Sequence, residues 1–563
     1  MFCPPKLITA AALLACVPML AAQDGSNAPA PFPVNITVDA AGATGDIHPI
    51  WRFFGADEPN YAYMKDGREL LGELGRMRPA GSTFFRAHNL LTSGDGTPAL
   101  KWGSTGAYHE DAAGKPVYDW TILDRIFDTY EENGLHPYTE IGFMPREMST
   151  HPDPYQHHFA TGANSGSIFT GWSYPPKNYT NWGDLVFQWA NHCVDRYGAD
   201  EVRQWYWETW NEPNIQYWHG RPDEFYKLHD FAVQAVRRAL PSAKVGGPDT
   251  AGAGRALRDF LEHCARGTNE ATGSVGTPVD FISFHAKGSP SFTDGHVRMG
   301  IANQLNTIND AFRIIATFPE FKAKPIVIGE SDPDSCAACL GGAYGYRNGL
   351  QFASYTAASF ARESDLATRH GVNLEGSLTW AFEFEDQPLF RGFRVLATGG
   401  IDLPVLNVFR MFNRLGGRRL AVQSDGAEPL DDILRQGVRA KPDVASLASL
   451  DGNTLCVLVW HYHDDDMPGP DAAVALEVNH IPSAAGPVRL RHFRIDQDHS
   501  DAFALWQRMG RPEHPSQKQF AQLHEAGQLA TLGAPETVVI HDGQATVRFT
   551  LPRQAVSLLV FDW

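Results

Sequence analysis

Residues 118–142 read YDWTILDRIFDTYEENGLHPYTEIG, and this stretch contains the repeating unit that decides the fold. From Trp120 to Phe127 the apolar side chains Trp120, Leu123, Ile126 and Phe127 recur three or four residues apart, which is typical of a helix with one face on a core. The short apolar run Pro137–Gly142 follows after a turn and is typical of a buried strand. The stretch therefore predicts a helix that leads into a strand.

The same alternation extends from about residue 48 to residue 420. Eight strands are predicted: Ile50–Phe54, Thr83–Ala87, Pro137–Gly142, Gln204–Trp210, Lys244–Gly247, Phe281–His285, Pro325–Gly329 and Gly376–Phe382. The predicted helices are Lys65–Met77, Trp120–Asn133, Trp182–Tyr197, Asp223–Leu240, Ala256–Ala265, Asn303–Phe318, Leu350–Arg369 and Pro404–Leu415. Alternating strands and helices imply parallel strands with crossover helices. Eight such units predict a (β/α)8 TIM barrel with long loops, over residues 48–422.

A doubly wound open sheet is the alternative architecture for such a pattern. That fold requires a glycine-rich phosphate turn after its first strand. Residues 54–58, FGADE, do not form one, so the barrel is preferred.

The pattern of apolar and polar residues changes after about residue 425. Short alternating runs, separated by Gly, Pro and Asp, predict an antiparallel β-sandwich over residues 423–563. These runs are Thr454–Tyr462, Ala473–Val478, Val488–Ile495, Ala545–Thr550 and Val556–Asp562. Residues 34–47 precede the barrel and begin with the alternating run VNITVDA, which predicts a further strand of the sandwich.

The N-terminus has the pattern of a secretory signal peptide. Lys6 precedes an apolar run, and the small residues Ala21 and Ala22 offer a cleavage site. Residues 1–22 are therefore predicted to be removed and 23–33 to form a tether, in a secreted or periplasmic protein. Lipid attachment through Cys16, in the lipobox-like sequence LLAC, is the alternative. The later sequence contains no segment typical of a membrane span.

Five cysteines remain after such processing: Cys193, Cys264, Cys336, Cys339 and Cys456. The C-x-x-C pair Cys336 and Cys339 has no second pair with which to form a structural zinc site. In an exported protein a local disulfide is the first interpretation, with free thiols or a metal or redox role as alternatives.

The composition excludes one class of partner. The 47 Lys and Arg residues against 65 Asp and Glu give a formal net charge of −18. Binding led by phosphate neutralisation requires a basic surface, so a nucleic-acid partner is not expected. The composition predicts no oligomeric state.

Two carboxylates stand where predicted strands end. The fourth strand runs into residues 210–214, WNEPN, and the seventh into residues 328–332, IGESD. Barrel enzymes carry their chemistry at the carboxyl ends of the strands, and strands four and seven lie nearly opposite each other. Glu212 and Glu330 are therefore predicted to face one another across the barrel mouth. Two facing carboxylates are the machinery of glycoside hydrolysis.

At these residues the sequence resembles the clan A retaining glycosidases, and in particular glycoside hydrolase family 39. The resemblance covers about residues 76–417. It rests on the segments FFRAHNLL (84–91), YDWTILDRIFD (118–128), WETWNEPN (207–214), DFISFHAKG (280–288) and KPIVIGESDP (324–333). The family contains β-xylosidases and α-L-iduronidases.

The resemblance implies a role for several residues. Glu212 becomes the general acid/base, Glu330 the nucleophile, and Asn211 a contact to the sugar 2-hydroxyl. The other implied sugar contacts are His88 and His285 at strand ends, Trp380 as an aromatic floor, and Glu383. Alternatively, Glu383 is an acidic loop residue exposed to solvent. A retaining mechanism of this kind requires no metal or cofactor.

Lys287 bears on which sugar is released. The segment HAKG (285–288) resembles the iduronidase form of this loop, in which the lysine meets the substrate carboxylate. Alternatively, Lys287 pairs with Asp332 or another loop acid. The first expectation is an exported β-xylosidase that releases xylose from the ends of xylo-oligosaccharides during plant polysaccharide breakdown. A uronidase or an arabinose-releasing enzyme is the second, and a carbohydrate-binding protein without turnover is the rival from another class.

The segment from Met144 to Asn181 is long and rich in aromatic and histidine residues, among them His151, His157 and His158. Loops of this length are usually functional. It is predicted to narrow the barrel mouth and to favour attack at chain ends. Its histidines lack the spacing of a metal site, so a structural role is expected for them.

Overall fold

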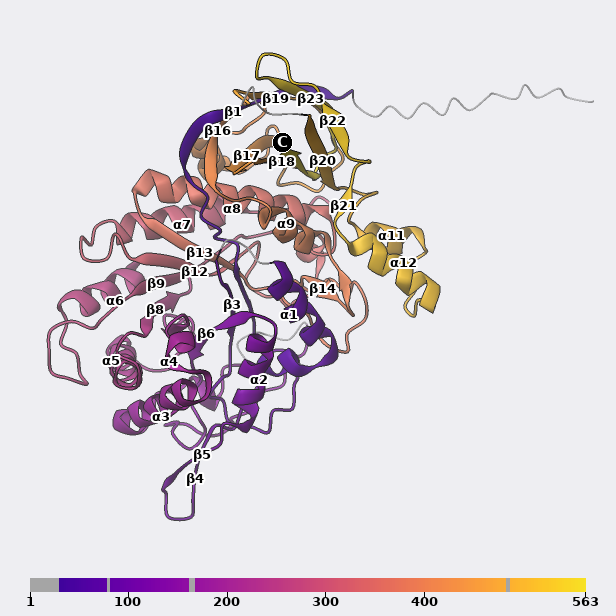
Figure 1. The fold of residues 1–563 in the computed structure, drawn as a ribbon. Coiled ribbons are helices and arrows are strands. Elements are labelled where there is room, and N and C mark those ends of the chain that lie inside the picture. Colours follow the sequence, from indigo (N-terminus) through magenta and orange to yellow (C-terminus); the bar gives the residue numbers. More distant parts are fainter. Residues whose placement is uncertain (1–29, 78–80, 162–167, 482–486) are drawn as a thin grey trace, which may run out of the picture.

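A computed structural model describes residues 30–77, 81–161, 168–481 and 487–563 (Figure 1). The predicted signal peptide, with Cys16, and residues 23–29 of the predicted tether lie outside these ranges. The tether prediction is wrong at its end, because Phe32 and Pro33 already belong to the first strand, β1 (Phe32–Asp46). No helix within the described ranges is long and apolar enough to cross a membrane.

Eight parallel strands close into a barrel, as predicted. In barrel order they are β12 (Pro325–Asp332), β13 (Asn373–Thr379), β2 (Phe53–Ala56), β3 (Thr83–Ala87), β6 (Leu135–Ile141), β7 (Tyr206–Thr209), β8 (Lys244–Thr250) and β9 (Phe281–Lys287). Each predicted strand overlaps one of these, and β3 has the predicted bounds. The largest difference is at β13, which starts and ends three residues before the predicted strand. β8 and β12 extend three residues beyond their predicted ends, and β2 starts three residues after its predicted start.

Helices surround the barrel at the predicted places. They are α1 (Lys65–Met77), α2 (Thr121–Glu132), α3 (Tyr179–Tyr197), α4 (Ala199–Val202), α5 (Pro222–Ala239), α6 (Arg255–Arg266), α7 (Ile301–Ile315), α8 (Leu350–His370) and α9 (Pro404–Phe412). Within the described ranges, 3-10 helices lie in the loops at η1 (Pro59–Tyr63), η3 (Gly171–Ser173) and η4 (Gly342–Tyr344). The loops also contain three hairpins: β4 (Tyr108–Glu110) with β5 (Pro116–Tyr118), β10 (Ser291–Thr293) with β11 (His296–Arg298), and β14 (Ala397–Thr398) with β15 (Ile401–Asp402).

Alternating side chains of the strands separate two packing layers. One set fills the barrel interior, namely Phe53, Phe84, Tyr138, Tyr206, Phe281, Val327, Leu378 and Trp380. Their neighbours along the strands, such as Phe54, Phe85 and Ile282, pack outward against the helices. This follows from the two-residue period of a strand, which sends successive side chains to opposite faces. The interior is therefore a packed aromatic core and not a channel.

The C-terminal strands form the predicted sandwich. They are β16 (Arg418–Ser424), β17 (Asp443–Asp451), β18 (Thr454–Tyr462), β19 (Ala472–Asn479), β20 (Val488–Ile495), β21 (Ala530–Thr531), β22 (Glu536–Val538), β23 (Ala545–Leu551) and β24 (Val556–Asp562). They belong to one continuous sheet that folds over its own apolar core, to which β1 contributes Val34, Ile36 and Val38.

β1 lies inside this sheet, antiparallel to β16 and parallel to β19. The chain therefore starts in the sandwich before it enters the barrel. The predicted boundary at residue 422 falls within β16, so the sandwich begins a few residues earlier than predicted. The reason is that β16 pairs along its length with β1, which local sequence does not reveal.

Helices α8 and α9 lie between the barrel and the sandwich (Figure 1). Apolar side chains of β18, β20 and β24, such as Trp460, Ile495 and Leu558, join the same core as the barrel helices. Helix α10 (Leu430–Gln436) packs against α7, and α11 (Ala502–Arg508) and α12 (Gln517–Gly527) pair beside the sandwich. The two domains thus share one apolar interior.

We expect Phe281→Ala to destabilise the protein by about 3–5 kcal/mol, because it opens a cavity in the fully buried barrel interior. Calorimetric unfolding would measure the loss. The matched control is Phe292→Ala, since that ring is 56% exposed and its removal should change stability by less than about 0.5 kcal/mol. Equal effects of the two changes would contradict the assignment of Phe281 to the core.

Candidate active site

A cavity of about 670 Å³ opens at the carboxyl ends of the barrel strands. It is lined by five of the predicted site residues: Glu212, His285, Lys287, Glu330 and Trp380. These residues come from four strands. Glu212 follows β7, His285 and Lys287 lie in β9, Glu330 lies in β12, and Trp380 follows β13. Residues scattered over the sequence therefore meet here, as expected for a barrel mouth.

Glu212 and Glu330 both lie close to the same imidazole nitrogen. The Nδ1 atom of His285 is 2.8 Å from Glu212 Oε1 and 3.8 Å from Glu330 Oε2. The two carboxylate oxygens are thus separated by no more than the sum of these distances. The predicted pair is brought face to face.

Positive charge surrounds Glu330. Lys287 Nζ lies 2.7 Å from its Oε2, and Arg86 Nη1 and His88 Nε2 each lie 3.8 Å from its Oε1. Burial alone would raise the pKa of Glu330, but the charges of His285 and Lys287 lower it well below its ordinary value. Glu330 is therefore held as a carboxylate.

Arg86 was not predicted as a site residue, although it lies at the mouth end of β3. Its fully buried guanidinium forms ion pairs with Glu140, Glu208 and Asp249, at the ends of β6, β7 and β8. Its Nη2 also donates to Asn211 Oδ1 at 3.1 Å. Arg86 thus connects four neighbouring strands directly beneath the cavity.

Asn211 is oriented by this contact. Its side-chain oxygen is occupied by Arg86, whereas its Nδ2 donor is buried and without a hydrogen-bond partner. An unpaired buried donor carries a free-energy cost that a ligand oxygen would remove. Asn211 therefore offers one donor beside Glu212.

Asp249 is a second residue that the sequence analysis missed. It is the penultimate residue of β8, in the segment GGPDT, and its Oδ2 lies 2.7 Å from His285 Nε2. Burial lowers the pKa of His285, but the charges of Asp249 and Glu330 outweigh it and raise that pKa to about 10. His285 is consequently an imidazolium that donates to Asp249 and Glu212. The strand-end rule would have found Asp249 if the predicted strand had not stopped at Gly247.

His88 is buried beside the cavity and is not among its lining residues. Its Nδ1 is 2.6 Å from Glu140, and its ring lies 4.4 Å from the ring of Trp380. Trp380 lines the cavity, and its backbone N–H donates to Asp332. His88 thus supports Trp380 and Glu330 from behind.

Lys287 pairs with two acids. Its Nζ lies 2.7 Å from Glu330 Oε2 and 2.7 Å from Asp332 Oδ2. The interpretation in which Lys287 pairs with Asp332 therefore describes the structure, with Glu330 as an additional partner.

Glu383 is not among the residues that line this cavity, although it follows β13 as Trp380 does. Its side chain is buried, and its Oε1 accepts the N–H of Gly400. Burial raises the pKa of Glu383 to about 8, assisted by the charges of Asp66 and Glu385. Glu383 is therefore not the solvated loop acid of the alternative interpretation, whereas its contact to sugar stays a prediction.

Two loops border the cavity. Phe159, Ile168 and Phe169 come from the long segment 144–181, which therefore narrows the mouth. On another side are Cys336 and Cys339, which form the predicted disulfide.

The histidines of the long loop have structural contacts. Trp172 Nε1 donates to His157 Nδ1 at 3.3 Å, so the Nε2–H of His157 donates to the carbonyl of Lys101 at 2.9 Å. Burial lowers the pKa of His157 to about 4, which keeps the ring neutral. Among the described residues of this loop, no histidine belongs to a group with metal-binding geometry.

Comparisons with known proteins agree with this geometry. The family model for glycosyl hydrolases family 39 matches residues 34–537. A β-xylosidase of Geobacillus stearothermophilus is 28% identical over 468 residues, covering 79% of this chain and 80% of that protein. An α-L-iduronidase of Mus musculus is 26% identical over 530 residues, covering 87% of this chain and 75% of that protein.

Solved structures share the fold. A bacterial orthologue of human α-L-iduronidase superposes with a TM-score of 0.75 at 21% identity, covering 94% of this chain and 84% of that one. A monomeric β-xylosidase from Caulobacter crescentus superposes with a TM-score of 0.72 at 22% identity, covering 94% and 99%.

Glu383→Gln should leave KM for substrate within about twofold and should stabilise the protein at alkaline pH. The wild-type carboxyl has a folded-state pKa above its ordinary value, so its contribution to stability is present at low pH and is lost as pH rises through about 8. The amide cannot ionise, which should give the variant an advantage on the order of 2–4 kcal/mol above that pH. Thermal unfolding from pH 5 to 9 would measure it.

The control for this experiment is Glu132→Gln, because the Glu132 side chain is 58% exposed and pairs only at the surface with Arg68. Its effect should not vary with pH in the same way. A large rise in KM for Glu383→Gln would instead establish this residue as a sugar contact.

Proposed function

Since the chain belongs to glycosyl hydrolases family 39 and is therefore an enzyme that acts on glycosidic bonds, we propose that it is a retaining exo-glycosidase, and specifically a β-xylosidase. The observation that carries this proposal is that Glu212 and Glu330 both lie close to Nδ1 of His285. Retaining enzymes need two carboxyl groups only about 5–5.5 Å apart, so that one can attack the sugar directly.

In the first step a carboxylate oxygen of Glu330 attacks the anomeric carbon. The bond from that carbon to the leaving oxygen breaks, and Glu212 gives its proton to this oxygen. A glycosyl ester on Glu330 results. In the second step Glu212 takes a proton from water, the water oxygen attacks the anomeric carbon, and Glu330 leaves as a carboxylate.

The surroundings support this division of roles. Glu330 is buried among cations that hold it ionised, as a nucleophile requires. Glu212 is more exposed and lines the open cavity, where a leaving group and water can reach it. Asn211, with its free Nδ2 donor, is in place to bind the hydroxyl next to the anomeric carbon.

The borders of the cavity support release of a terminal sugar. The segment that contains Phe159 and Phe169 and the loop with the Cys336–Cys339 disulfide both line it. A cavity bordered in this way accepts a chain end more readily than the middle of a polysaccharide. Xylo-oligosaccharide ends are the proposed substrate, and the signal-like N-terminus supports an exported enzyme of plant polysaccharide breakdown.

The charges favour a neutral sugar. Each cation that lines the cavity already has acidic partners: Lys101 has Asp57, Lys287 has Glu330 and Asp332, and Arg394 has Asp334. A substrate carboxylate would have to displace one of these acids. Xylose carries none, and β-xylosidases are among the relatives of this chain.

A uronidase is the second candidate. Three cations, Lys101, Lys287 and Arg394, line the same cavity as Glu330, and α-L-iduronidases are also among the relatives. An arabinose-releasing activity is tested by the same comparison of substrates, described below. A binding protein without turnover is disfavoured, because both carboxylates are present and face the cavity.

Glu330→Gln should lower kcat/KM on an aryl xyloside by about 10³-fold or more, because the amide cannot form the glycosyl ester. Glu132→Gln, at the surface, is the matched control and should keep wild-type activity. Proton NMR should show that the first sugar released by the wild type has the same anomeric configuration as the substrate. Turnover near that of the wild type in Glu330→Gln, or an inverted first product, would overturn the mechanism.

Lys287→Gln should move the acidic limb of kcat/KM on a xyloside to higher pH. Lys287 lowers the pKa of Glu330, so its removal raises that pKa and more alkaline solution is needed to ionise the nucleophile. The assay compares 4-nitrophenyl β-xyloside, α-arabinoside and a uronide, for wild type and variant. The uronidase would be established instead if the wild type turned over only the uronide and Lys287→Gln lost this activity while it still bound xylose as the wild type does.

A further inference from the structure

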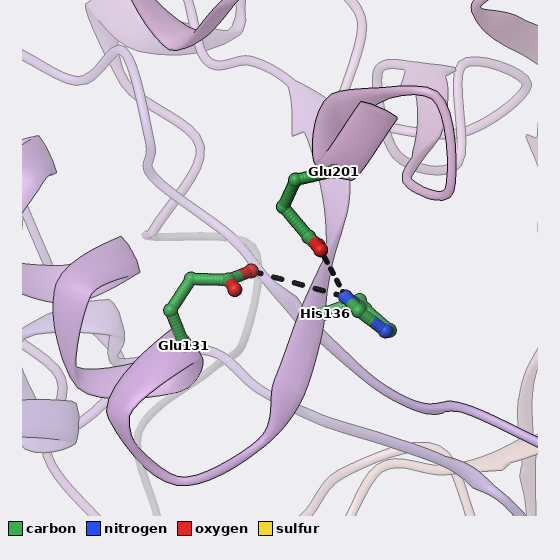
Figure 2. A group of neighbouring side chains, drawn as sticks. All are labelled: Glu131, His136 and Glu201. Carbon is green, nitrogen blue, oxygen red and sulfur yellow. Dashed lines mark hydrogen bonds and ion pairs between the residues drawn. The ribbon is translucent and has the colours of Figure 1, made fainter. Parts of the chain in front are cut away.

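Three polar side chains meet at the end of the barrel opposite to the cavity (Figure 2). Glu131 is in the last turn of α2, His136 is the second residue of β6, and Glu201 is in the short helix α4 that precedes β7. Figure 2 shows the three side chains pointing toward one another from these separate elements. They take no part in the site described above.

The geometry is that of a ligand set. One atom from each residue can be chosen so that all three lie within 4.8 Å of one another. His136 Nδ1 bonds to Glu201 Oε1 and is 3.8 Å from Glu131 Oε1. The side chains are 16%, 25% and 23% exposed for His136, Glu131 and Glu201, so an ion could enter from solvent and still be largely enclosed.

Glu131 lacks a close partner. Its Oε1 is buried and accepts no hydrogen bond within normal distance, and the partner it does have, His136 Nδ1, is 3.8 Å away, which is a weak pairing for a buried carboxylate oxygen. It also lies at the negative end of the α2 dipole, and the last turn of α2 contains no basic residue. Both facts favour positive charge at this place. Burial lowers the pKa of His136, but Glu131 and Glu201 raise it to about 9, so a proton on this imidazole supplies the charge unless a cation replaces it.

We propose that Glu131, His136 and Glu201 bind a divalent cation of the zinc class. An imidazole nitrogen with two carboxylate oxygens is a ligand set that Zn²⁺ accepts, with water completing a tetrahedron. Ligand atoms lie about 2.0–2.2 Å from such an ion, so the side chains of the three residues would have to adjust around it. Trp205 Nε1 donates to Glu201 Oε1 at 2.8 Å and orients this ligand from behind.

The ion would connect the end of α2 to the start of β6 and to α4. These elements belong to adjacent βα units, so the site would stabilise the barrel without touching the reaction. In barrel enzymes this end of the strands serves stability, whereas the chemistry occupies the other end.

The experiment titrates ZnCl₂ into the full chain after removal of metals with EDTA, using calorimetry. Wild type should bind one ion that His136→Gln and Glu131→Gln each bind at least about tenfold more weakly. Zn²⁺ should also raise the Tm of the wild type by about 2–4 °C and leave that of the variants unchanged. The catalytic activity of both variants should equal that of the wild type.

His192→Gln is the matched control. His192 Nε2 lies 2.6 Å from Asp124 and its side chain is 24% exposed, but it faces no second buried carboxylate oxygen without a partner. This variant should bind Zn²⁺ as the wild type does. If the wild type, His136→Gln and Glu131→Gln give the same isotherm and the same Tm shift, the site binds no metal and the proton on His136 alone joins the two carboxylates. Use of two ligand variants keeps the test valid if one of them folds poorly.

Discussion

The buried guanidinium of Arg86 is the interaction on which the barrel mouth depends. It pairs with carboxylates of Glu140, Glu208 and Asp249, so that one cation joins the ends of four neighbouring strands. Breaking a buried pair by removing one partner costs about 3–5 kcal/mol, because the other charge stays buried without compensation. Here three acids share the one arginine. The positions of Asn211 and His285, which orient the two facing carboxylates, follow from this network.

The two facing glutamates both stand at the end of a barrel strand, but their surroundings differ. Glu330 is buried within reach of Lys287, Arg86 and His285, and these charges hold it ionised against the effect of burial. Glu212 is more exposed, and it contacts Nδ1 of the same histidine, His285. Unequal surroundings allow two groups of one chemical type to carry opposite roles in catalysis. The barrel supplies this asymmetry by bringing different strands against each carboxylate.

The domain arrangement explains why the ends of the chain fold together. β1 lies between β16 and β19, so the sandwich is complete only when residues near both termini have met. The aliphatic side chains of β18 and β24 then extend the core of the barrel helices. The sandwich is therefore part of the structural support of the barrel and not an appended module.

Local patterns were sufficient for the elements and for the central pair. The strand Thr83–Ala87 and the helix Lys65–Met77 were predicted with their observed bounds, because side-chain periodicity and turn residues are properties of a few neighbouring residues. Glu212 and Glu330 could be predicted because each stands at a strand end, and a barrel places all strand ends at one mouth. The domain boundary was misplaced because β16 is recognised only by its pairing with β1.

The sequence by itself determined which elements form, that eight of them close into a barrel, and that two carboxylates face each other. Only the tertiary structure decided the partners of Lys287, the burial of Glu383, and the meeting of Glu131 with Glu201. The physical reason is that charge state and solvent exposure depend on atoms brought near from distant parts of the chain. Periodicity is a local property, whereas an electrostatic environment is not.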